Sequence, residues 1–102
     1  CAITATAKLI GKKWHPVIVH RLLEGDKGFN ELKRDVDGVT AKVLSESLED
    51  LQEHGLVRRE VVSERPKQVS YSLTESGRSL EPIIREMKGW ADDHLVQQVS
   101  AE

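Results

Sequence analysis

Apolar positions change their spacing along the chain between residues 29 and 73. They recur every three or four residues from 29 to 36 and again from 40 to 54, which indicates two amphipathic helices. From 57 to 73 the spacing shortens, and apolar and polar residues alternate at Val69, Tyr71 and Leu73, as in a half-buried strand. The pattern therefore predicts a short helix, a turn, a longer helix and a hairpin.

The residues at the joints of this segment support the same order. Gly38 is a turn residue, and the hydroxyl of Thr40 can cap the first turn of the longer helix. Gly55 follows that helix at a position where positive φ commonly ends one. The stretch 63–67 is polar, so we expect it to form the exposed tip between two strands at 57–62 and 68–73.

Further helices are predicted on both sides of this segment. An apolar stripe over residues 3–10 predicts a first helix, and Pro16 fits the first turn of a second helix that begins near Lys13. Residues 74–97 are predicted to form a last helix, capped by Thr74 and bent at Pro82. The fold class predicted is mainly α, a winged helix-turn-helix of five helices and a small β-hairpin wing.

Length and composition restrict the possibilities further. A chain of 102 residues is expected to form one domain, and no stretch is long and apolar enough to span a bilayer, so no membrane association is expected. One cysteine excludes an intrachain disulfide and fits a reducing compartment, hence a cytoplasmic protein. The histidines lack metal-ligand spacing and no nucleophile or phosphate-loop motif occurs, so we expect no metal, no cofactor and no enzymatic activity.

Charge is unevenly distributed along the chain, although the net charge is only −2. Positive charge predominates before residue 35 and in the hairpin, whereas residues 35–56 and 74–102 are acidic. Phosphate responds to the local field at a contact face, so double-stranded DNA remains a suitable partner. The acidic stretch 35–56 favours an alternative, in which the winged helix is a protein–protein interaction module without specific DNA binding.

Candidate DNA contacts follow from the way a helix enters the major groove. The first turns of the helix starting near residue 40 would reach base edges, while the preceding helix and the wing would contact phosphates. The candidates are Lys33, Arg34, Thr40, Ala41, Lys42, Ser45, Ser47, Arg58, Arg65 and Lys67. Arg59 is a neighbour of Arg58 on the strand and would face the opposite side.

Two features concern regulation and assembly. Cys1 is either an unreactive terminal thiol or a redox sensor, and sensing would require a depressed thiol pKa. The terminal helices carry more apolar residues than so short a core needs, which predicts a homodimer. Its interface would contain Ile3, Ile83, Met87 and Trp90.

Together these residues resemble the HxlR-type transcriptional regulators, a branch of the MarR-like winged helix proteins. The resemblance rests on Cys1, Gly11–Trp14, Phe29–Arg34, Thr40–Leu51 and His54–Arg59, and on Pro66, Val69, Tyr71, Leu73, Thr74, Gly77 and Trp90. It implies a homodimer on a pseudo-palindromic operator, with an oxidant or small-molecule inducer sensed in some relatives through the N-terminal cysteine. The chain departs from the family pattern at Lys12, Gly28 and Ser47, the last two being places where the family often has arginine.

Overall fold

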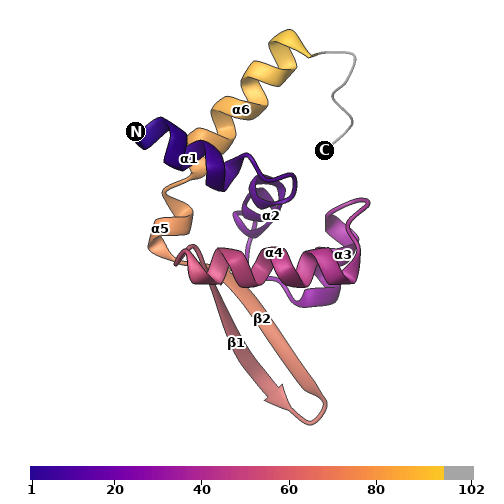
Figure 1. The fold of residues 1–102 in the computed structure, drawn as a ribbon. Coiled ribbons are helices and arrows are strands. Elements are labelled where there is room, and N and C mark those ends of the chain that lie inside the picture. The colour runs from indigo at the N-terminus through magenta and orange to yellow at the C-terminus, as the bar shows by residue number, and fades with distance from the viewer. Residues whose placement is uncertain (96–102) are drawn as a thin grey trace.

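The computed structural model describes residues 1–95 (Figure 1). Six helices and two strands occur in this part of the chain. They are α1 (Ala2–Ile10), α2 (His15–Leu22), α3 (Phe29–Asp35), α4 (Ala41–Glu53), β1 (Val57–Glu64), β2 (Lys67–Leu73), α5 (Glu75–Arg78) and α6 (Glu81–His94). The predicted mainly helical fold with one hairpin is confirmed.

The core lies where α2, α3 and α4 meet the base of the hairpin. Its fully buried side chains come mainly from these helices and the α3–α4 turn: Ile18, Val19, Leu32, Val36, Leu44, Leu48 and Leu51. Burial of one such side chain contributes about 1.5–3 kcal/mol. The buried set therefore fixes α4 against α2 and α3, with its opposite face left to solvent.

The turn between α3 and α4 depends on one glycine. Gly38 has a φ of 87°, in the left-handed region of backbone conformation that residues other than glycine rarely adopt. Val36 and Val39 on either side of it are buried, so the turn is held to the core at both ends. The helix-turn-helix predicted from the apolar spacing is thus present, and its turn is packed on the core.

The hairpin is antiparallel, with Val57 opposite Leu73 and Val61 opposite Val69. The register then shifts by one residue at Val62, so that Ser63 faces Gln68 and Glu64 faces Lys67. Both strands extend further than expected, and the predicted five-residue tip is reduced to residues 65–66. Only the base of the hairpin is buried, and the rest projects away from the helices (Figure 1).

The last predicted helix is divided in two. Instead of one helix bent at Pro82, a single turn, α5, is followed by α6, and Pro82 lies in the first turn of α6. Thr74 caps α5 as predicted, its hydroxyl accepting from Gly77 N at 3.1 Å. Gly77 packs directly on the carbonyl of Leu56, where any Cβ would overlap that oxygen. This contact holds α5 on the hairpin base, and α6 leaves in a new direction.

The predicted extension of that helix to residue 97 includes residues 96 and 97, which lie outside the described residues. Within residues 1–95, no helix combines the length and the apolar character that crossing a membrane requires.

Candidate nucleic-acid interface

The start of α4 is an open, capped helix end. Val43 N donates to the Thr40 hydroxyl at 3.2 Å, and Thr40 itself has an extended backbone, as an N-cap residue should. The cap predicted from the sequence is therefore confirmed. Capping leaves other N–H groups of the first turn free, and such groups favour a phosphate oxygen.

The predicted base-contacting residues of α4 divide into exposed and buried positions. Ala41, Lys42 and Ser45 are exposed, together with Thr40 just before the helix. Ser47 is only 7% exposed and lies on the buried side with Leu44, Leu48 and Leu51. A groove-facing role for Ser47 is therefore wrong, because at helical spacing it points towards the core rather than outwards.

The predicted phosphate contacts lie on α3 and on the hairpin. Lys33 and Arg34 are exposed in the last turn of α3. Arg65 and Lys67 are exposed at the hairpin tip, and Arg58 and Arg59 are exposed nearer its base. None of these six cations forms an ion pair with another residue of the described part of the chain. Their charges are therefore available to an anionic partner.

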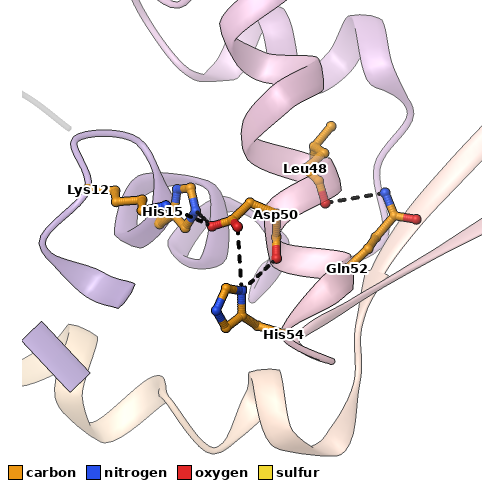
Figure 2. A network of polar contacts seen from close by, with 6 residues as sticks. All are labelled: Lys12, His15, Leu48, Asp50, Gln52 and His54. Atoms are coloured by element: carbon orange, nitrogen blue, oxygen red, sulfur yellow. Dashed lines mark hydrogen bonds and ion pairs between the residues drawn. The ribbon is translucent and has the colours of Figure 1, made fainter. Parts of the chain in front are cut away.

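The rear half of α4 is tied by a polar network to the first residue of α2 and to the segment before it (Figure 2). Asp50 Oδ2 lies 2.6 Å from His15 Nε2 and 3.2 Å from Lys12 Nζ. His54, one turn further along, contacts the backbone oxygen of Asp50 through Nδ1 at 2.8 Å. The hydrogen bond from His15, with that from Lys12, holds the pKa of the Asp50 carboxyl below its ordinary value.

This network was missed in the sequence because its members are 35 and 38 residues apart. In the sequence, Asp50 was one member of the acidic stretch 35–56, and Lys12 was a departure from the family pattern. The structure shows that this carboxylate of the acidic stretch is used internally. It anchors the end of α4 that is remote from the capped end.

A second missed contact supports α3. The loop residue Lys27 pairs with Tyr71 of β2 through two backbone hydrogen bonds of 2.7 and 3.0 Å. Its ammonium group lies 3.0 Å from Asp35 and 3.5 Å from Glu24. The hydrogen bond to Asp35 is the main cause of the raised pKa of Lys27. This cation therefore fixes α3 to the wing and is not free for phosphate.

The surface predicted for dimerisation is exposed. α1 contains no buried residue, and Ile3 is 80% exposed. On α6, Ile83, Met87 and Trp90 are all exposed, and Trp90 reaches 59%. Both helices lie at the end of the molecule away from the hairpin tip (Figure 1). Cys1 is an exposed free thiol directly before α1.

No three His, Cys, Asp or Glu side chains gather closely enough to hold a metal ion anywhere in residues 1–95. Two of the four histidines, His15 and His54, instead contact Asp50.

Residues 9–99 match the model of the HxlR-like helix-turn-helix family. The chain is 39% identical over 84 residues to the transcriptional regulator YodB of Bacillus subtilis (strain 168), covering 82% of this chain and 75% of YodB. The structure of the redox regulator HypR in its oxidised form superposes with a TM-score of 0.85, at 39% identity, over 92% of this chain and 97% of HypR. Quinone-bound YodB superposes with a TM-score of 0.78, at 34% identity, over 90% of this chain and 97% of that one.

Proposed function

The chain belongs to the HxlR-like helix-turn-helix family of DNA-binding transcriptional regulators, and we propose that it acts as a homodimer on a pseudo-palindromic operator. The observation that carries this proposal is the open front of α4. Its capped first turns are exposed, and the exposed cations of α3 and the hairpin form no ion pair within residues 1–95. In a dimer, two such ends would enter successive major grooves about 34 Å apart.

The exposed apolar side chains of α1 and α6 support the homodimer. Ile3, Met87 and Trp90 form apolar surface that a lone chain would leave in water. Burial of apolar surface is the main favourable contribution to most protein–protein association. Sedimentation at micromolar concentration is expected to give a dimer, and Trp90→Ala is expected to weaken it. A wild-type monomer at that concentration would contradict the assembly.

DNA binding by this chain is tested directly by a gel shift against pooled genomic fragments. We expect retarded fragments at low and moderate salt, and a selection from random duplexes should return one motif with internal two-fold symmetry. Selection of a single asymmetric site would argue against the homodimeric operator. Absence of any shift would favour the alternative of a protein-interaction module, for which the acidic face of α4 is suited.

We propose further that an oxidant or electrophile controls DNA binding through Cys1. One support is that this thiol is exposed directly before α1. The other is that two similar proteins have structures in such states, namely the redox regulator HypR in its oxidised form and YodB with bound quinone. Treatment with diamide or a quinone should change operator affinity in the wild type and leave Cys1→Ser unchanged. Equal responses of the two proteins would remove Cys1 from regulation. We propose that the protein acts in the cytoplasm as a regulator and has no catalytic activity.

A further inference from the structure

One line of side chains on α4 points directly away from the core. With about 3.6 residues per turn, positions 42, 46, 49 and 53 fall within a narrow sector of the helix circumference. That sector lies opposite the buried Leu44, Leu48 and Leu51, and all four residues in it are exposed. Only Lys42 and Glu46 of this line belong to the first two turns. If α4 enters a groove by its capped end, these two side chains face its floor.

The carboxylate of Glu46 is free. No cation of residues 1–95 lies within ion-pair distance of it, not even Lys42 one turn earlier. A lysine placed four residues before a glutamate is also the weaker order for a helical ion pair. Glu46 therefore differs from Asp50, whose carboxylate is engaged by His15 and Lys12. No internal role accounts for Glu46.

A free carboxylate facing the major groove has a narrow choice of partners. It only accepts hydrogen bonds, and the phosphates on either side repel it. The base edges offer amino groups as donors, and a carboxylate characteristically accepts from N4 of cytosine. Accordingly, we propose that Glu46 is a specificity-determining residue that selects a cytosine in each half-site. This inference rests on the proposed function, because it requires α4 to read an operator.

Glu53 provides a matched control. It points in the same direction as Glu46 and is exposed, but it is the last residue of α4, about 10 Å further along the helix axis. Removing either carboxylate takes one negative charge from the same line of the helix. Only removal of Glu46 is expected to change sequence preference.

The experiment is a selection from random duplexes with wild type, Glu46→Ala and Glu53→Ala, followed by titration of the selected site with each base at the affected position. Both variants are expected to fold normally, since the altered side chains are exposed, and to bind random duplexes more tightly than wild type because repulsion is lost. Wild type and Glu53→Ala should prefer cytosine by about tenfold at one position per half-site. Glu46→Ala should accept all four bases there.

The possible outcomes distinguish failure of this inference from failure of the proposed function. A wild-type protein that selects no sequence would overturn the proposed function and the inference together. If wild type selects a motif and Glu46→Ala selects the same motif with the same cytosine, the role of Glu46 is overturned and the regulator remains. If Glu53→Ala loses the cytosine preference as Glu46→Ala does, the effect is one of charge, and base selection by Glu46 is overturned.

Discussion

The two ends of α4 differ in exposure and in their contacts with the rest of the chain. At the front end one hydroxyl caps the helix, and Thr40, Ala41, Lys42 and Ser45 are exposed, while Leu44 packs into the core. The rear end is packed by buried Leu48 and Leu51, and Asp50 ties it to His15 and Lys12 (Figure 2). Acidic residues are compatible with DNA binding here because three of the four in α4, Glu49, Asp50 and Glu53, lie in its rear half.

The largest effect is expected from the packing of the rear end. Leu48→Ala removes a side chain that is 1% exposed, and the free energy of unfolding should fall by about 2–5 kcal/mol. Urea unfolding at fixed protein concentration measures this. Glu53→Ala, at an exposed position of the same helix, should change stability by less than about 0.5 kcal/mol. Equal losses for the two variants would mean that the rear of α4 is not anchored by its apolar face.

A substitution at the front end of α4 should change DNA binding and leave the free energy of unfolding almost unchanged. Lys42→Ala is expected to weaken binding to the selected operator by about 1–3 kcal/mol, provided that Lys42 contacts a base, and to leave urea unfolding almost unchanged. Titration of operator and of random duplex by fluorescence anisotropy separates specific from general loss. Unaltered operator affinity would remove Lys42 from the interface.

The Asp50 network is expected to contribute less than the apolar packing. Asp50→Asn should lower the free energy of unfolding by about 1.5 kcal/mol at pH 7, because hydrogen bonds from His15 and Lys12 to a charged group are lost. The folded pKa of Asp50 lies below its ordinary value of 3.8. The stabilisation is therefore present above that value and disappears as the pH falls through the folded pKa.

Urea unfolding of wild type and Asp50→Asn between pH 3 and pH 7 checks this dependence. The difference between the two proteins should shrink only in the most acidic samples. Glu49→Gln is the matched control, since Glu49 is exposed and forms no ion pair within residues 1–95. A difference for Asp50→Asn no larger than that for Glu49→Gln would show that the network does not stabilise the fold.

Loss of the N-terminal cap of α4 should lower the free energy of unfolding by about 1 kcal/mol. Thr40→Ala removes the acceptor for Val43 N, whereas Thr40→Ser retains a hydroxyl and serves as its control. Hydrogen exchange is expected to rise in the first turn of α4 in the alanine variant and not in its rear half. Exchange that rises equally along the whole helix would contradict the separation of the two ends.

The smallest effect concerns the wing. Arg65→Ala should weaken binding to all duplexes alike and reduce the salt dependence of the binding constant by about one unit, as expected for one lost phosphate contact. Binding titrations at several salt concentrations give this slope. An unchanged slope would mean that the hairpin tip lies away from the backbone.

Much of the fold could be predicted from apolar spacing and turn residues. The helix expected from residue 40 to 54 is present as Ala41–Glu53, and both threonine caps are present. These features are local, since a cap or an amphipathic face depends on residues within one or two turns. The exposed candidates Lys42, Ser45, Arg65 and Lys67 could be identified for the same reason.

The rest depended on contacts between distant parts of the chain. The break between α5 and α6 accompanies the close packing of Gly77 on Leu56, a contact between residues 21 positions apart. Asp50 and Glu49 are adjacent acidic residues in the sequence, yet only the folded chain brings His15 and Lys12 to one of them. The sequence alone determined most of the elements, from α1 to β2, because their signals are periodic and local. The tertiary structure decided which charges are used internally and which remain for a ligand, because that depends on what each side chain meets across the fold.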